Sequence, residues 1–244
     1  MFRACLAVIY WGVWIKSAYV QINRSGFFDL EYFTEWGVWL TTIYFTYAFV
    51  THLRYRGKDG TPKDTESIWN AWKWLSALFV TILLWECIIA SIYWPVLFPA
   101  DLEDRLRGKP LKQFSNLFDH AVPVTCLWID WVLNRIWVEW NQLYQNLFII
   151  AIYGAVNIAV TKVRGTPVYP PISWDSFGAW LIGLSILPLA FAYFTAIYYL
   201  TKCKFRKMAM HDAIVYEAAA STMVTSDNVT SSYNPLSQVG TSRE

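Results

Sequence analysis

Two residues of this sequence, Thr34 and His120, have the side-chain chemistry of a nucleophile and its general base. An alcohol becomes an effective nucleophile when a neighbouring imidazole accepts its proton during attack on a carbonyl carbon. The product is an acyl-enzyme that water then hydrolyses. His120 stands where the chain enters a long apolar segment, and Thr34 stands near the start of another. The pair is therefore a candidate catalytic dyad for ester cleavage.

The two residues are expected at a similar depth in a membrane. The apolar segments that begin near residues 31 and 118 are the second and fourth of the chain, so both enter the membrane from the same side. The hydroxyl and the imidazole could then meet if the two helices are neighbours. Each residue also has a structural explanation: most membrane threonines bond to carbonyls of their own helix, as we expect for Thr41, Thr42 and Thr46. A histidine at a helix entrance can be a capped or interfacial residue.

Composition and apolar segments indicate an integral membrane protein. Apolar residues make up 56% and charged residues 16% of the chain, against roughly 45–50% and about 25% in soluble domains. Crossing the ~30 Å hydrocarbon core takes about 20 mainly apolar residues, and long segments without two-residue alternation predict helices. Six segments qualify: residues 4–22, 31–52, 71–98, 118–138, 143–161 and 177–200. We therefore predict an all-α membrane protein, a bundle of six transmembrane helices.

The bundle is predicted over residues 1–207, and residues 208–244 are predicted to form a cytosolic, mostly disordered tail because the last part is rich in Ser and Thr. The first apolar segment, which follows Met1-Phe2-Arg3, is expected to remain as an uncleaved span. Nine Lys and Arg residues fall on the side of the termini and seven on the other side. This distribution favours cytosolic termini, in the endoplasmic reticulum or the plasma membrane.

Asp130 is the most deeply placed acid of the fourth segment. It follows His120 by ten residues, or ~15 Å along a helix, so it cannot orient that ring. Its expected partners are Asn134 one turn away, Glu86 through a shared proton, or Arg135 through a local bend. We interpret it as a helix-packing hydrogen-bond group.

Other features limit the classes of ligand. The four cysteines lack metal-ligand spacing, so a metal site is not expected. No organic cofactor is implied either. A net charge of +2 is too small to indicate nucleic acid. The expected partners are membrane lipids, including a lipid-ester substrate. Donors to an oxyanion are not identified, although Ser115, Asn116 and Tyr169 lie on the same side as Thr34.

Three segments of the chain resemble the androgen-induced family of membrane hydrolases, and within it the Rolling stone-like proteins. The matching segments are Tyr32–Trp36 with Leu40–Phe45, His120–Val122 with Leu127–Asp130, and Val168–Pro170. The resemblance implies that Thr34 and His120 are the catalytic pair and that the substrates are fatty acid esters of hydroxy fatty acids. The Rolling stone-like branch, which is linked to myoblast fusion, implies the alternative of a non-enzymatic multi-pass protein in adhesion, fusion or complex assembly. A transporter is less favoured because no inverted repeat is found.

Overall fold

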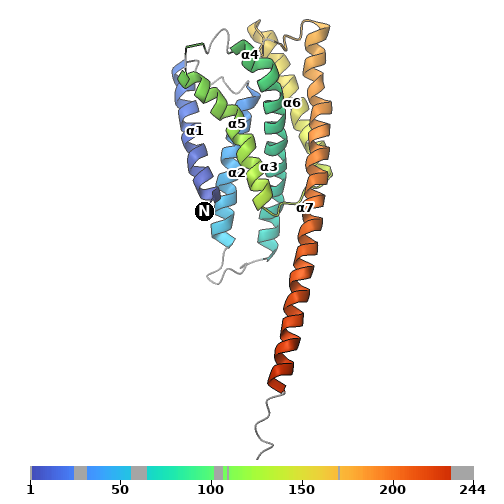
Figure 1. Ribbon diagram of the computed structural model, residues 1–244. Coiled ribbons are helices and arrows are strands. Elements are labelled where there is room, and N and C mark those ends of the chain that lie inside the picture. Colours follow the sequence, from blue (N-terminus) through green and yellow to red (C-terminus); the bar gives the residue numbers. More distant parts are fainter. Residues whose placement is uncertain are drawn as a thin grey trace, which may run out of the picture. The chain divides into compact units, whose positions relative to one another are not determined.

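A computed structural model describes residues 2–24, 32–55, 65–101, 107–108, 110–169 and 171–231 (Figure 1), and the described chain is helical with short connections and no strand. The predicted all-α class is confirmed. The helices are α1 (Phe2–Arg24), α2 (Phe33–Tyr55), α3 (Thr65–Ile92), α4 (Phe98–Asp101), α5 (Pro110–Leu133), α6 (Asn141–Arg164) and α7 (Phe177–Ser231), with a π-helical turn, Tyr93–Leu97, between α3 and α4.

The core of the unit formed by Met1–Tyr198 is built around α3, which packs against α2, α5 and α6. All side chains from Phe79 to Ile89 are buried. A helix that is apolar on every side reaches a stable position only when other helices surround it, which explains its central place in Figure 1.

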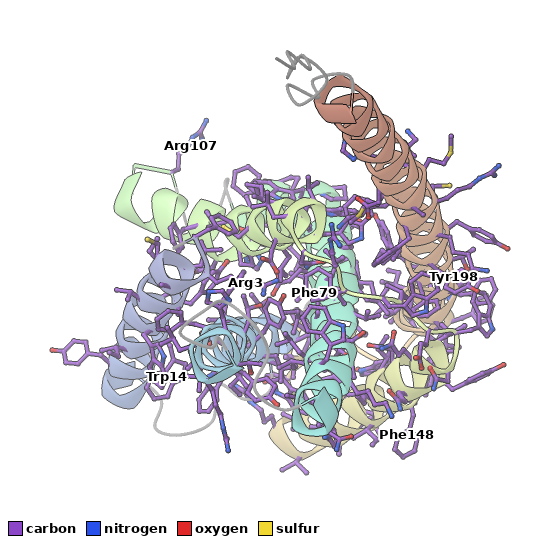
Figure 2. All side chains as sticks on the ribbon, turned by 90° about the horizontal axis from the view of Figure 1, so that it is seen from below. Arg3, Trp14, Phe79, Arg107, Phe148 and Tyr198 are labelled. Carbon is purple, nitrogen blue, oxygen red and sulfur yellow. The ribbon has the colours of Figure 1, made fainter. Side chains whose placement is uncertain are left out.

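Three helical stretches in the described ranges are long and apolar enough to cross a membrane: Asn70–Leu97, Asn141–Arg164 and Phe177–Asp212. They differ in how far the rest of the protein covers them. α3 is mostly enclosed, whereas α6 exposes large apolar side chains such as Phe148, which is 67% exposed at the outer edge of the unit in Figure 2. An apolar outer face on a long apolar helix is typical of contact with lipid.

The C-terminal part of α7 belongs to a second compact unit, Tyr199–Glu244. Residues 208–231 were predicted within a disordered tail, and the structure instead describes them as a continuation of the helix. This stretch contains no Gly or Pro and includes a Glu-Ala-Ala-Ala run of strong helix formers. Residues 232–244 of the predicted tail lie outside the described residues.

The end of α5 also differs from the prediction, which extended the segment to residue 138. The helix ends at Leu133. The amide N–H of Ile136 donates a hydrogen bond to the side-chain oxygen of Asn134 over 3.0 Å, which holds the chain in a non-helical turn. Ile136 and Val138 are buried in the connection to α6. Their burial explains why this connection has an apolar sequence although it is not part of the helix.

The crossing of α2 and α3 depends on Gly37. A Cβ atom at this position would collide with Oε1 of Glu86 and lie 3.2 Å from Cδ1 of Ile89. Because Glu86 is only 1% exposed, its side chain has little room to move away. The absence of a side chain at residue 37 therefore permits the close approach of the two helices.

Gly37→Ala is expected to destabilise the protein by about 1–3 kcal/mol, because overpacking forces a buried side chain out of its rotamer. Thermal unfolding in detergent measures the effect. Gly12→Ala is the matched control: nothing lies within 4 Å of a Cβ atom there, so the better helix former should be neutral or stabilise by up to about 1 kcal/mol. Equal stability of the two variants would contradict the packing explanation.

Candidate functional site

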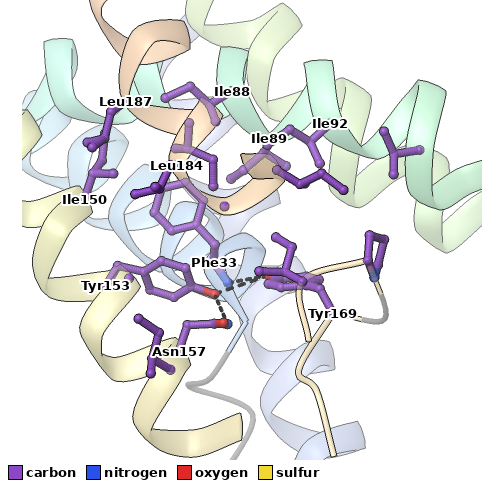
Figure 3. A pocket seen from close by; sticks show the side chains of 18 of the residues that line it. Phe33, Ile88, Ile89, Ile92, Ile150, Tyr153, Asn157, Tyr169, Leu184 and Leu187 are labelled. Atoms are coloured by element: carbon purple, nitrogen blue, oxygen red, sulfur yellow. Dashed lines mark hydrogen bonds between the residues drawn. The ribbon is translucent and has the colours of Figure 1, made fainter. Parts of the chain in front are cut away.

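Thr34 and His120 line the same cavity. The cavity has a volume of about 330 Å³ and lies between α2, the end of α3, α5, α6, the connection 165–176 and the start of α7. Figure 3 shows its wall, which is mainly aliphatic and includes Ile88, Ile89, Ile92, Ile150, Leu184 and Leu187. In the described part of the chain, no hydrogen bond joins the Thr34 hydroxyl to His120. Catalytic hydrogen bonds are often long or absent before substrate binds.

His120 is held on the cavity wall by α5 and by the π-helical turn. Its ring stacks on Tyr93 with centroids 3.4 Å apart and planes 15° from parallel. Its Nδ1 atom is buried without a hydrogen-bond partner among the residues described. Pro95 lies within the π-helical turn, and such turns are frequent at functional sites. The site thus contains an imidazole nitrogen whose hydrogen-bonding capacity is not used by the described part of the chain.

Thr34 is placed by the N-terminus of α2. The carbonyl of Tyr32 accepts hydrogen bonds from the amides of Glu35 and Trp36, at 3.1 and 3.4 Å, and so forms the first turn. Phe33 is anchored between two rings, with centroids 4.6 Å from Trp85 and 4.7 Å from Tyr153. The next residue, Thr34, is therefore carried by a well-packed helix end.

The other threonines of α2 behave as structural residues, with one exception. Thr42 donates to the carbonyl of Val38 and Thr46 donates to the carbonyl of Thr42, each over 2.8 Å, as predicted. The hydroxyl of Thr41 is buried without a partner in the ranges that the structure describes, so the prediction for Thr41 was wrong.

A chain of hydrogen bonds lies beside Thr34. The hydroxyl oxygen of Tyr169 accepts the amide N–H of Phe33 at 2.8 Å and is 3.5 Å from the hydroxyl of Tyr153. The amide nitrogen of Asn157 is 3.5 Å from the Tyr153 hydroxyl, and its oxygen accepts the indole N–H of Trp174 at 2.8 Å. Figure 3 shows Tyr153, Asn157 and Tyr169 in this arrangement. Sequence reasoning found only Tyr169. A Tyr and an Asn four residues apart on an otherwise apolar helix were the available signal.

Burial raises the pKa of Tyr169, which lies in the connection between α6 and α7, above the ordinary value of a phenol. Hydrogen bonds from Tyr153 and the Phe33 amide oppose this effect only in part. The phenol therefore stays protonated at neutral pH and can act as a hydrogen-bond donor.

Trp174 holds the connection that contains Tyr169 in place through packing and hydrogen bonds. Trp174 has φ of 61°, a left-handed conformation that is rare for a bulky residue. Its backbone carbonyl accepts the indole N–H of Trp180 at 3.2 Å. Its ring packs on Gly183 of α7 so closely that a Cβ atom there would collide with it. Packing and hydrogen bonds thus stabilise a strained residue at the cavity.

A second buried polar cluster surrounds Asp130. Its carboxylate accepts hydrogen bonds from Nε and Nη2 of Arg3, at 2.9 Å and 3.2 Å, from the Tyr44 hydroxyl and from Nδ2 of Asn134 at 3.2 Å. Figure 2 shows Arg3 inside the unit rather than at its rim. The predicted contact with Asn134 is confirmed.

The predicted contacts of Asp130 with Arg135 and with Glu86 were wrong. Arg135 is exposed, and the two carboxyl oxygens of Glu86 are buried without a hydrogen-bond partner in the described chain. Arg3 and Tyr44 take their place. The side chains of Ser115 and Asn116, two of the candidate oxyanion donors, lie outside the described residues.

The arrangement can hold an apolar molecule, because the lining is mainly apolar and polar residues such as Thr34, His120 and Tyr169 are a minority of it. Among the residues that can be described, no group of three or more His, Cys, Asp or Glu side chains could hold a metal ion.

No protein-family profile, curated protein or solved structure matches the chain, so the assignment of function rests on this site.

Proposed function

We propose that the protein is an intramembrane hydrolase that cleaves lipid esters with Thr34 as nucleophile and His120 as general base. The observation that carries the proposal is that these two residues, from α2 and α5, line one mainly apolar cavity. Its volume of about 330 Å³ falls within the range of about 300–1,000 Å³ that is usual for small-molecule sites. An aliphatic wall suits an acyl chain. The resemblance to the androgen-induced family supports fatty acid esters of hydroxy fatty acids as substrates.

The reaction proceeds in two halves. His120 accepts the proton of Thr34 as Oγ1 forms a bond to the ester carbonyl carbon, and the carbonyl π electrons move to its oxygen. When this intermediate collapses, the bond to the alcohol oxygen breaks and His120 returns the proton to that oxygen. Water then attacks the acyl-threonine with the same base, which releases the fatty acid and restores Thr34.

The membrane arrangement that we propose has six spans, with α1, α2 and α5 alongside the three most apolar helices. α1 and α2 have 23 residues each, or ~35 Å at 1.5 Å per residue, enough for the ~30 Å hydrocarbon core. α5 has 24 residues, and we place its part before residue 118 outside the hydrocarbon core. The distribution of Lys and Arg supports cytosolic termini. Thr34 and His120 then lie near the opposite face, and the membrane is that of the endoplasmic reticulum or the cell surface.

The proposal predicts that an alkyl fluorophosphonate labels Thr34, because a nucleophile activated by a base attacks phosphorus as it attacks a carbonyl carbon. The full chain in detergent or nanodiscs is incubated with the probe, and the labelled peptide is identified by mass spectrometry. Hydrolysis of a branched fatty ester is followed in parallel.

Thr34→Ser should retain labelling, whereas His120→Ala should lose it. A wild-type protein that neither takes the label nor hydrolyses the ester would reject the enzyme. That result would favour a non-enzymatic protein of adhesion, fusion or complex assembly.

A further inference from the structure

The hydrogen bonds behind Tyr169 have a direction that the chemistry of Trp174 decides. An indole N–H can only donate. Because it donates to Oδ1 of Asn157, the amide group of Asn157 must place its NH₂ towards Tyr153. The oxygen of Tyr153 is then an acceptor, and its own O–H is directed to the oxygen of Tyr169. Every bond in this series therefore points from Trp174 towards Tyr169.

At the end of the series, the Tyr169 oxygen is an acceptor from two sides. The Phe33 amide donates to it at 2.8 Å, and the Tyr153 hydroxyl approaches it at 3.5 Å. A phenol has one proton of its own to donate. With the oxygen engaged from these two sides, that proton is left for a group on the remaining side of Tyr169.

Thr34 is the candidate group. Tyr169 and Thr34 both line the cavity, and the Tyr169 hydroxyl lies 2.8 Å from the amide nitrogen of Phe33, the residue next to Thr34. In the tetrahedral intermediate of ester cleavage, the oxyanion and Thr34 Oγ1 are bonded to the same carbon. A donor that reaches Oγ1 can therefore also reach the oxyanion, for which the productive distance is about 2.7–3.1 Å.

We infer that Tyr169 is a catalytic residue whose hydroxyl donates the hydrogen bond that stabilises the oxyanion of the proposed hydrolysis. This inference rests on the proposed function and adds a residue to it. Tyr169 keeps its proton: it stabilises charge on the carbonyl oxygen, while the proton of Thr34 passes to His120. The fixed direction of the hydrogen bonds means that the donor needs no reorientation when charge develops.

Tyr169→Phe is expected to lower kcat by about 10²–10³-fold with little change in KM, as is usual when a single oxyanion donor is removed. The ester hydrolysis assay on the purified full chain measures both constants. Tyr144→Phe is the matched control, because Tyr144 is 66% exposed on α6 and does not line the cavity. Its kcat should equal that of the wild type.

A second variant separates catalysis from structure, because Tyr169→Phe also removes the acceptor of the Phe33 amide. Difluorotyrosine at position 169 keeps the ring and its hydrogen bonds but lowers the pKa of the phenol. If the protonated phenol is the donor, the alkaline loss of activity should move to lower pH than in the wild type. A structural role would leave the pH profile unchanged.

The outcomes distinguish this inference from the proposed function. Absence of both hydrolysis and Thr34 labelling in the wild type would reject the proposed function and this inference with it. An active wild type, together with unchanged kcat in Tyr169→Phe, would overturn the role of Tyr169 alone. An unshifted pH profile for the difluorotyrosine protein would overturn it in the same way, even if Tyr169→Phe fails to fold.

Discussion

Thr34→Ala is expected to reduce the rate of ester hydrolysis by about 10⁴-fold or more, because removal of a nucleophile abolishes the covalent route and leaves only binding and electrostatic effects. The same loss is expected for His120→Ala, since neither member of a nucleophile–base pair functions without the other. The measurement is kcat/KM for a branched fatty ester, with the purified protein in detergent or nanodiscs.

The double variant gives a sharper result than either single one. Residues that act as a unit are not additive, so Thr34→Ala combined with His120→Ala should be about as slow as the slower single variant. Thr42→Ala is the control on the same helix, because that hydroxyl only bonds to the carbonyl of Val38. Hydrolysis that persists in both single variants would show that another group is the nucleophile.

Arg3→Met is expected to destabilise the fold by about 3–5 kcal/mol, because breaking a buried ion pair leaves an uncompensated charge. The Asp130 side chain is 1% exposed and that of Arg3 is 24% exposed. The residual exposure of Arg3 places the expected value at the lower end of this range. Unfolding of the purified protein in detergent, by heat or by denaturant, measures the loss.

Two further variants decide whether the pair itself is responsible. Arg3→Met combined with Asp130→Leu should recover much of the stability lost by either change, since replacing both charges with apolar groups is often close to neutral. Lys162→Ala is the surface control: that lysine pairs with Asp175, and both side chains are more than half exposed, so a loss of about 1 kcal/mol at most is expected. Comparable effects at Arg3 and Lys162 would contradict a buried pair.

The helical class and the approximate extent of the helices could be predicted because they depend on local chemistry. A long run of apolar residues satisfies its backbone hydrogen bonds within itself, and this requirement does not depend on which neighbours it acquires. Thr34 and His120 could be nominated for a related reason. Side chains that can do chemistry are few in apolar segments, and the predicted order of six spans puts these two on the same side of the membrane.

The partners of Asp130 show which contacts can be predicted from the local sequence and which cannot. Its contact with Asn134 follows from helical spacing, whereas Arg3 and Tyr44 come from segments 127 and 86 residues away. Their approach depends on how α1, α2 and α5 pack, which is a sum of many weak contacts over the whole unit. Lys and Arg counts near the ends of segments carry no information about such a pair.

For the candidate site too, one part could be predicted from the sequence and another part depended on tertiary packing. The kinds of residue at positions 34 and 120 follow from the local sequence, and their similar depth in a membrane is a prediction from counting spans. The shared cavity, the stacking of His120 on Tyr93 and the series of hydrogen bonds from Trp174 to Tyr169 exist only after α2, α3, α5 and α6 and the connection 165–176 have assembled. Helix formation is a local event, but a cavity and the direction of its donors are properties of close packing between distant segments.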